Sequence, residues 1–399
     1  MTQQFESMLY LFGAAEHGAT TVLKADTLKL HIEEIRNHAL AQGIWTMVFS
    51  ELGEYCDVSL FKTEITSGVT KSMVEKEFTF GILKKLEEQG VRCCILKGAV
   101  VAECYKHPEL RISSDTDILI DPKDEEKVKE FLRANGYVVE ERLPNHHHLG
   151  ARHPFGGLLE VHVMLYSEIT QKVVFDNLNM YGEPWEQVSI GGETYHTLGV
   201  NDNLMYLTAH YIKHLVNSGG GVRQMMDLLL FIEKNKEKID FEKYEKLLKQ
   251  LKYDKLIDVV KAIGAKYFGF DYEIKEEALM EKVLTDTEEG GIFGKETDTR
   301  KMFYDAYCEE RSVMSKYSTK IYMAVKKESG SISWWLPKQE TLIKAYGFRY
   351  AKCKLLIPVA WVHRYLRVLW RKWMARNKPK RTPEQEERLT LMRELGMIE

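Results

Sequence analysis

The chain changes its hydrophobic periodicity twice. From Phe5 to about Gln89, apolar residues recur every three or four positions, which is the spacing of an amphipathic helix. Helical spacing returns after Asn201 and continues to the end of the chain. The part between holds short apolar runs with two-residue alternation, the pattern of β-strands. The pattern therefore predicts an α+β protein, with a small mixed β-sheet flanked by N-terminal and C-terminal helical regions.

The middle of the chain alternates between predicted strands and predicted helices. Helices are expected over residues 99–106 and 125–135, and the second ends at Gly136, a common residue just past a helix end. Gly156 and Gly157 separate two strand-like segments, so we expect a hairpin and a partly antiparallel sheet. The predicted strands are residues 93–96, 117–120, 137–141 and 158–165.

Length and periodicity together predict several packed units. A chain of 399 residues exceeds one ordinary hydrophobic core, because domains cluster near about 100 to 200 residues. A loop rich in Glu, Thr and Gly at residues 285–299 is the clearest internal break. We expect a helical N-terminal region, a mixed α/β core, a helical domain and a helical C-terminal region, at residues 1–90, 91–198, 199–284 and 285–399.

The composition is that of an ordered globular protein. Hydrophobic residues make up 44% and charged residues 29%, with only 9 prolines, which excludes a disordered chain. The 6 cysteines form no CxxC pair, and residues 1–14 lack the basic start and cleavage site of a signal peptide, so we expect a reducing cytoplasm. The chain has no run of about 18 apolar residues, so we expect no membrane span. The net charge of −3 gives no strong nucleic-acid signal.

Three carboxylates in the predicted sheet form a candidate metal site. Asp115 and Asp117 lie two residues apart at the start of an apolar strand, so the strand period places both on one face. Glu160 is a lone acid in an otherwise apolar strand, where an unpaired carboxylate is unfavourable. A shared cation would stabilise all three, and such oxygen ligands suit Mg²⁺ or Mn²⁺. We therefore assign all three as catalytic residues and metal ligands; the alternative is solvated acids at a strand edge.

A lysine and a glycine stand between the first predicted strand and the helix after it. Backbone N–H groups at a helix start, together with Lys97, form a seat for a phosphate group beside Gly98. The lysine could instead be a solvated surface side chain. We interpret the order of these elements along the chain as one site. The order is a strand, Lys-Gly, a helix, an Asp-x-Asp strand, a second helix and a strand with a lone acidic residue.

These residues resemble the nucleotidyltransferase superfamily, with its DNA polymerase beta-like core, and more closely the bacterial uncharacterised nucleotidyltransferase family. The resemblance rests on Leu96-Lys97-Gly98, Tyr105, Arg111 and Asp115-Thr116-Asp117, and on Glu160 with His162 further along. It implies a nucleotidyltransferase core with a five-stranded type of mixed sheet, helical flanks and Mg²⁺-dependent transfer of a nucleoside monophosphate. We expect the nucleotide to bind at Lys97, Gly98, Arg111 and Ser114.

One departure from the wider superfamily leaves two functions open. The usual Gly-Ser or Gly-Gly is Lys97-Gly98 here, so the serine that binds the triphosphate is missing. We expect a nucleotidyltransferase that moves an NMP from an NTP such as ATP to an unknown hydroxyl or phosphate acceptor and releases pyrophosphate. The alternative is a catalytically degenerate nucleotide-binding or partner-binding module of the same fold. The acceptor stays open, because one fold serves many acceptors.

Histidines near the acids have competing interpretations. His162 shares a strand face with Glu160 and could orient a ligand or contact nucleotide, or be a satisfied core histidine. The histidines at residues 146–148 cannot converge if they lie on one strand, since neighbouring side chains point to opposite faces, so we expect no zinc there. His210 and His214 are four residues apart on a predicted helix without a third ligand, so packing or capping is favoured over metal binding.

Two further charged features each have more than one interpretation. Arg223 and Asp227, one helical turn apart, could form an ion pair, or Arg223 could reach a phosphate. Residues 358–376 combine apolar and basic side chains at helical spacing. This pattern favours a packed terminal helix with a solvated basic face, and the alternatives are peripheral contact with an anionic membrane surface or with a nucleic acid backbone.

Overall fold

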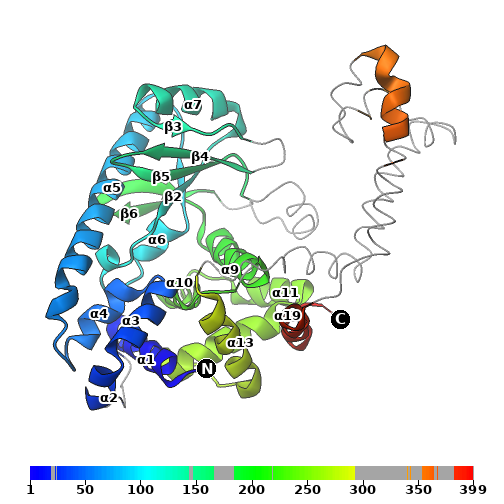
Figure 1. Cartoon of the computed structure of the whole chain (residues 1–399). Helices are drawn as coiled ribbons and strands as arrows, with labels where there is room; N and C mark the ends of the chain where they lie inside the picture. The colour runs from blue at the N-terminus through cyan, green and yellow to red at the C-terminus, as the bar shows by residue number, and fades with distance from the viewer. Residues whose placement is uncertain are drawn as a thin grey trace. The chain divides into compact units, whose positions relative to one another are not determined.

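The protein has two compact units. The computed structural model describes residues 1–18, 23, 25–142, 147–165, 184–217, 219–292, 339, 342, 353–363, 366 and 382–398. One unit comprises Met1–Arg300 and Leu391–Met397, and the other comprises Lys301–Thr390 and Ile398–Glu399. The sheet lies in the first unit (Figure 1). The finer division at positions 90/91, 198/199 and 284/285 stays a prediction.

A seven-stranded mixed sheet forms the centre of the first unit. The strand order is β3-β4-β5-β2-β1-β7-β6. β2 pairs with β5, and β1 with β7, in parallel, and the other neighbours are antiparallel. The α+β fold class is confirmed. The strands are β1 Cys94–Leu96, β2 Asp115–Leu119, β3 Val138–Val139, β4 His148–His153, β5 Gly157–His162, β6 Glu186–Ile190 and β7 Glu193–Thr197.

The sheet has two more strands than the five-stranded type that the resemblance implied. The expected hairpin is present, because β4 and β5 pair antiparallel across Gly156. The additional strands, β6 and β7, form a second hairpin whose two-residue turn, Gly191 and Gly192, has φ of 58° and 84°. Positive φ at both turn positions is what a tight hairpin requires and what glycine supplies. Exposed polar residues such as Glu186 and Thr194 give these strands little hydrophobic alternation, so the pattern missed them.

Two helices cover one face of the sheet. They are α5 (Lys62–Glu88), which runs alongside the strands, and α7 (Glu125–Ala134), at the β3 end (Figure 1). Their apolar side chains pack on alternate strand residues in one buried core. Because strand side chains alternate between faces, the residues between these core positions point to the opposite face. The core residues of the four central strands are Ile95, Ile118, Leu149, Ala151, Leu159 and Val161.

Apart from α6, which follows β1, the remaining helices of the first unit come from both sides of the sheet segment in the sequence. Buried Gln42 connects the two sets, since its Nε2 donates to Thr287 O at 2.8 Å and its Oε1 accepts from Val222 N at 3.0 Å. The helices are α1 Gln3–His17, α2 Ala25–Leu30, α3 Ile32–Ala41, α4 Trp45–Leu52, α6 Gly98–Ala102, α9 Val200–Asn217, α10 Val222–Lys234, α11 Phe241–Leu251, α12 Asp254–Ile263 and α13 Glu277–Gly290, with a π-helical turn at Gly264–Phe268 and 3-10 turns at Ser59–Phe61, Pro108–Leu110 and Pro122–Asp124.

The predicted basic helix at residues 358–376 is described only in part. Residues 357–363 are helical and follow a 3-10 turn at Lys354–Leu356, while 364–365 and 367–376 lie outside the described residues. The last described helix is α19, Pro383–Glu394. Within the described ranges, every helix is too short or too polar to span a bilayer.

Candidate active site

The candidate site lies on the sheet face opposite the α5 and α7 core. Strand register sets its members side by side: Asp117 of β2 pairs with Glu160 of β5, and on its other side with Leu96 of β1. His148 of β4 likewise pairs with His162 of β5. Directly paired residues point to the same face, so the two acids and the two histidines gather at one place.

Asp117 is the centre of this group. Its carboxylate is 5% exposed and accepts hydrogen bonds from Lys97 Nζ and His162 Nε2, each at 2.8 Å and both on Oδ1. Burial alone would raise the pKa of Asp117, but the Lys97 charge and the His162 hydrogen bond outweigh it and hold this pKa well below the ordinary value. Asp117 is therefore a carboxylate anion at neutral pH.

Glu160 and His162 complete a group of potential metal ligands with Asp117. His162 Nε2 lies 3.7 Å from Glu160 Oε2, and one ligand atom from each of the three residues lies within 4.8 Å of the others. The nearby His162 imidazole lowers the pKa of Glu160 against burial and the Asp117 charge. The structure thus brings together Asp117 and Glu160, two of the three predicted ligands.

Asp115, the third predicted ligand, lies outside that group. It is on the same strand face as Asp117, but residues two apart on a strand are separated by about 6.5 Å along the backbone. Its Oδ1 accepts from Ser113 Oγ at 2.7 Å. Burial, followed by the charge of Asp117, raises the pKa of Asp115. Ser114, which we expected to contact nucleotide, is exposed, and its neighbour Ser113 was not anticipated.

Lys97 is held in an unusual backbone conformation. Its φ is 48° and its ψ is −118°, a region that non-glycine residues avoid at about 1–3 kcal/mol. This conformation ends β1 and sends the side chain to Asp117, with Nζ 5.7 Å from the Tyr206 ring centroid. Burial opposes the charge, yet Asp117 raises the pKa of Lys97, so the ammonium persists. Lys97 is therefore not a solvated surface lysine.

Arg111 joins the Lys97–Gly98 turn to α10. Its Nε and Nη2 donate to the two carboxylate oxygens of Asp227 at 2.8 and 2.6 Å, and its Nη1 donates to Gly98 O at 3.0 Å. Tyr105 also donates to Asp227 at 2.6 Å. All three guanidinium nitrogens of Arg111 thus bind protein acceptors. We expected Arg111 to bind nucleotide, and its contacts favour a role in positioning the turn.

Arg223 does not form the ion pair that its spacing offered, since Asp227 pairs with Arg111. Its Nη1 instead donates to the carbonyl oxygens of Gly43 and Ile112, at 3.2 and 2.8 Å. Its Nε is buried without a hydrogen-bond partner. Burial, followed by the Arg111 charge, lowers the pKa of Arg223 to about 10.

Helix α9 contributes two neighbouring histidines, His210 and His214. The rings of His210 and His214 are 4.5 Å apart between centroids. Burial, followed by nearby cationic side chains, lowers the pKa of His214 to about 4 and that of His210 well below the ordinary value. Neither belongs to a group of three potential metal ligands among the described residues.

The prediction that consecutive histidines cannot converge is wrong for the two that the structure describes. Nε2 of His147 lies 3.3 Å from Nδ1 of His148. The physical reason is that β4 begins at His148, so His147 precedes the strand and escapes its alternation. His146 lies outside the described residues.

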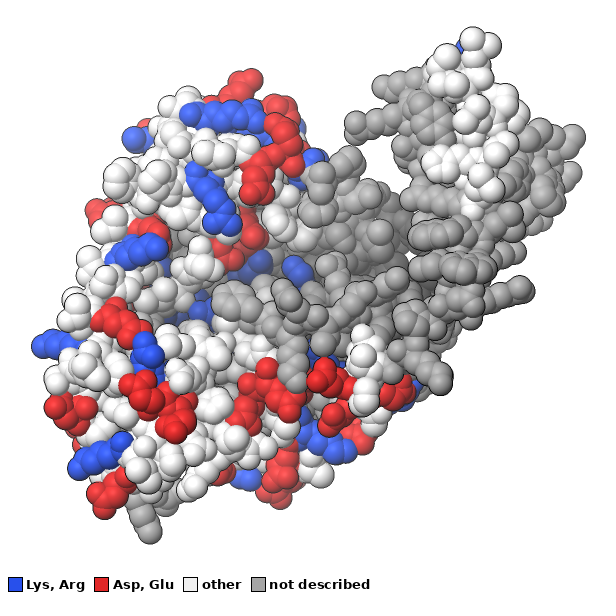
Figure 2. Space-filling view, in the orientation of Figure 1, with Lys and Arg blue, Asp and Glu red and all other residues white. Residues whose placement is uncertain are grey.

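A cavity of about 570 Å³ opens at the C-terminal ends of β2 and β5. No acid or histidine of the candidate site lines it, so the candidate chemistry lies outside this cavity. Its walls are Gly90, Arg92, Leu119, Ile120, Asp121, Pro122, Lys123, Asp124, Val163, Met164, Leu165, Trp185, Leu198 and Asp202. On the molecular face in Figure 2, acidic and basic side chains are interspersed over the described surface.

The segment that carries the sheet and the site is similar to a known family. Residues 72–269 match the model of a family described as uncharacterised nucleotidyltransferase. The matched segment is just under half of the chain, and it begins within α5, contains every strand that the structure describes and ends after the π-helical turn. No curated protein is detectably similar to the chain.

Several solved structures are similar to part of the chain. The lincomycin-bound lincosamide antibiotic adenylyltransferase LnuA is 16% identical, with 39% of this chain and 95% of that chain covered and a TM-score of 0.28. The antibiotic-resistance factor ANT(2'')-Ia is 12% identical, with coverages of 44% and 90% and a TM-score of 0.33. An antigenic nucleotidyltransferase-like protein from Paracoccidioides brasiliensis is 15% identical, with coverages of 41% and 77% and a TM-score of 0.29.

Proposed function

We propose that this protein transfers a nucleoside monophosphate from an NTP to a hydroxyl or phosphate acceptor and releases pyrophosphate. The observation that supports it is the direct pairing of Asp117 with Glu160 on parallel neighbouring strands, with ligand atoms close enough to share a cation. Carboxylate oxygens of this kind fit Mg²⁺ or Mn²⁺. Such an ion, when bound, neutralises charge on the phosphates and lowers the pKa of a bound hydroxyl.

The side chains around Asp117 have distinct proposed roles. Asp117 is the principal ligand, and Asp115 joins it from the same strand face. Glu160 either completes the ligand set or takes the proton of the acceptor hydroxyl. Lys97, whose ammonium bonds Asp117, competes with a divalent cation for that carboxylate. When the cation binds, Nζ becomes available to a phosphate oxygen, which is how Lys97 can compensate for the serine that the superfamily usually has.

The test is metal-dependent nucleotide binding. ATP, GTP, CTP and UTP are titrated into the protein with Mn²⁺ by calorimetry, using wild type, Glu160→Gln and Glu193→Gln. Glu193 is the control, because it is an exposed strand acid paired with Lys84 away from the site. We expect Glu160→Gln to weaken Mn²⁺-dependent binding at least tenfold and Glu193→Gln to leave it unchanged. Equal affinity in all three proteins would show that the metal assignment is wrong.

One observation favours a second candidate, a catalytically degenerate module that binds nucleotide or a partner. Lys97 already neutralises Asp117 in this structure, which weakens the attraction of that carboxylate for a cation. The two candidates differ in pyrophosphate release. If an NTP binds but no pyrophosphate appears with hydroxyl compounds, sugar phosphates, RNA or the protein itself as acceptor, the degenerate module is the correct one.

A subsidiary proposal concerns contact between residues 358–376 and an anionic membrane surface. Its support is the exposure of apolar residues in and beside the helical segment, with Val359 at 53%, Val362 at 59% and Leu366 at 59%. Pelleting with phosphatidylserine vesicles tests it. Val362→Glu should reduce pelleting severalfold, while Leu60→Glu, at another exposed apolar residue, should not.

We also propose that the protein works in a reducing compartment such as the cytoplasm. The free thiols of Cys56, Cys93 and Cys94 agree with this proposal.

A further inference from the structure

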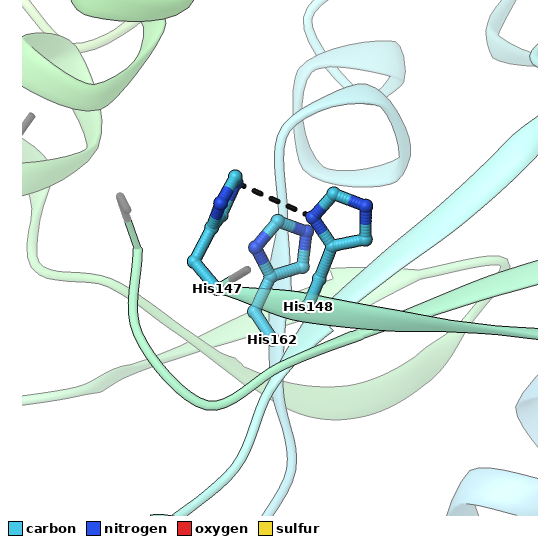
Figure 3. Close-up of side chains that lie close together, drawn as sticks. All are labelled: His147, His148 and His162. Carbon is cyan, nitrogen blue, oxygen red and sulfur yellow. Dashed lines mark hydrogen bonds between the residues drawn. The ribbon is translucent and has the colours of Figure 1, made fainter. Parts of the chain in front are cut away.

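Three imidazole rings meet at the edge of the candidate site. His148 and His162 are direct partners in the antiparallel β4–β5 pair, and His147 immediately precedes β4. One ring nitrogen from each lies within 4.8 Å of the other two. Figure 3 shows the three rings gathered together, with a nitrogen of His162 turned toward His147. We propose that His147, His148 and His162 bind a divalent transition-metal ion of the zinc class.

The spacing of the nitrogens fits such an ion. Nε2 of His147 and Nδ1 of His148 are 3.3 Å apart. Tetrahedral zinc with Zn–N bonds of about 2.0–2.1 Å places two ligand nitrogens about 3.3 Å apart, so this pair already has the separation of one tetrahedral edge. The His162 ring centroid is 5.3 Å from that of His147 and 5.1 Å from that of His148, so the third ring lies beside this pair.

His162 has a nitrogen suited to be the third ligand. The side chain is 1% exposed, and its Nδ1 is buried without a hydrogen-bond partner, which is unfavourable for a polar atom. Its Nε2 donates to Asp117 at 2.8 Å, which fixes the tautomer and leaves the lone pair on Nδ1. A carboxylate that accepts from one ring nitrogen while the other binds metal is the usual arrangement around ligating histidines. Asp117 is thus a positioning residue for this second ion.

The donor atoms identify the class of ion. Imidazole nitrogens bind zinc-class ions, whereas Mg²⁺ favours oxygen ligands. The ion at the three histidines therefore differs from the ion proposed at the carboxylates. Three protein ligands also leave a position for water or a phosphate oxygen. This inference stands independently of the proposed transfer activity.

Co²⁺ titration of the whole protein, after chelator treatment, tests the site. Co²⁺ is the probe because its visible absorption reports nitrogen coordination in a four- or five-coordinate site. We expect one equivalent to bind and Zn²⁺ to displace it. His147→Ala and His148→Ala should each weaken Co²⁺ binding at least tenfold. The matched control is His153→Ala, which removes a histidine of the same strand whose ring stacks on Phe78 at 4.3 Å.

A competition with Mg²⁺ separates this site from the carboxylate site. Excess Mg²⁺ should leave Co²⁺ bound, because Mg²⁺ favours oxygen ligands over imidazole nitrogens. The proposal is overturned if Co²⁺ does not saturate, if both histidine variants bind it as wild type does, or if Mg²⁺ displaces it. His162→Ala is not the deciding variant, since it also removes the hydrogen bond to Asp117.

Discussion

Lys97 Nζ lies 2.8 Å from Asp117 Oδ1, and the two side chains are only 12% and 5% exposed. The pair joins neighbouring strands, because Lys97 follows β1 and Asp117 pairs with Leu96 of that strand. A buried ion pair is stable only while both partners remain, since the survivor is left as an uncompensated buried charge. Any cation that binds Asp117 must therefore displace or rearrange the ammonium of Lys97.

The first prediction is that Lys97→Ala separates metal binding from triphosphate binding. Mn²⁺ should bind more tightly without nucleotide, because the ammonium no longer competes for Asp117. ATP should bind more weakly, by about 1.5–3 kcal/mol, the scale of a hydrogen bond to a charged group. Adenosine should bind as before, since it has no phosphate. Calorimetric dissociation constants for Mn²⁺, for ATP with Mg²⁺ and for adenosine measure the three effects.

Lys84→Ala is the control for Lys97, because Lys84 pairs with Glu193 on the surface at 2.8 Å. Its three dissociation constants should match wild type. Unchanged ATP affinity in Lys97→Ala would mean that the lysine serves only the ion pair, and the phosphate role would have to be abandoned.

The second prediction is that Asp117→Asn abolishes transfer and also destabilises the fold. The amide keeps the shape of the carboxylate, so from sequence alone the change looks harmless to folding. In the structure, however, it leaves the buried Lys97 ammonium without its counter-charge. Removing one partner of a buried pair costs about 3–5 kcal/mol. Urea unfolding should show this loss, and the double variant Lys97→Met with Asp117→Asn should recover most of it. Equal stability of Asp117→Asn and wild type would contradict the buried-pair argument.

The local sequence pattern predicted which residues are candidates for this site, and strand register determines which of them lie side by side. The two-residue period placed Asp115 and Asp117 on one strand, where β2 has them, and the lone acid in an apolar strand singled out Glu160, which lies in β5. The period could not reveal that β5 lies beside β2, because strand order depends on distant contacts. For the same reason the pairing of Glu160 with Asp117, and the hydrogen bond from His162, had no local signal.

Distant contacts also explain the residues whose roles shifted. Arg111 and Asp227 are 116 positions apart, and no spacing rule connects them, whereas Arg223 lies one helical turn from Asp227 and looked like the natural partner. The buried bidentate pair with Arg111 gives both carboxylate oxygens of Asp227 a partner, and Tyr105 adds a third donor. The helical-turn rule gives only possible neighbours, and the packed structure selects among them.

The third prediction is that the protein loses stability between pH 7 and pH 5. His214 has a folded pKa of about 4, below the unfolded value of about 6.5. The unfolded state therefore binds a proton first, so stability is full above about pH 6.5 and falls as pH drops toward the folded pKa. One such histidine contributes up to about 2 kcal/mol over this window. Asp117, whose pKa is also lowered, makes stability depend on pH only below about pH 4.

Urea unfolding at pH 7 and pH 5 measures this pH dependence. His214→Gln should reduce it, because glutamine does not titrate, while His210, whose pKa is also lowered, retains its own contribution. His107→Gln, at an exposed histidine with 51% of its side chain accessible, should leave it unchanged. If wild type and His214→Gln lose equal stability on acidification, His214 is not buried in its neutral form.

The last prediction compares two glycines in helices. Gly13 of α1 packs against the π-helical turn, and a Cβ there would lie 2.7 Å from the Phe268 Cα, closer than Cβ atoms approach backbone. Gly13→Ala must push the two elements apart, so we expect a loss of about 1–3 kcal/mol or more, the scale of overpacking a core. Gly81 of α5 is exposed, with nothing within 4 Å of a Cβ, and there alanine should stabilise by about 1 kcal/mol through helix propensity. Thermal and urea unfolding of the two variants should therefore shift in opposite directions. A Gly13→Ala protein as stable as wild type would show that α1 does not pack closely on Phe268.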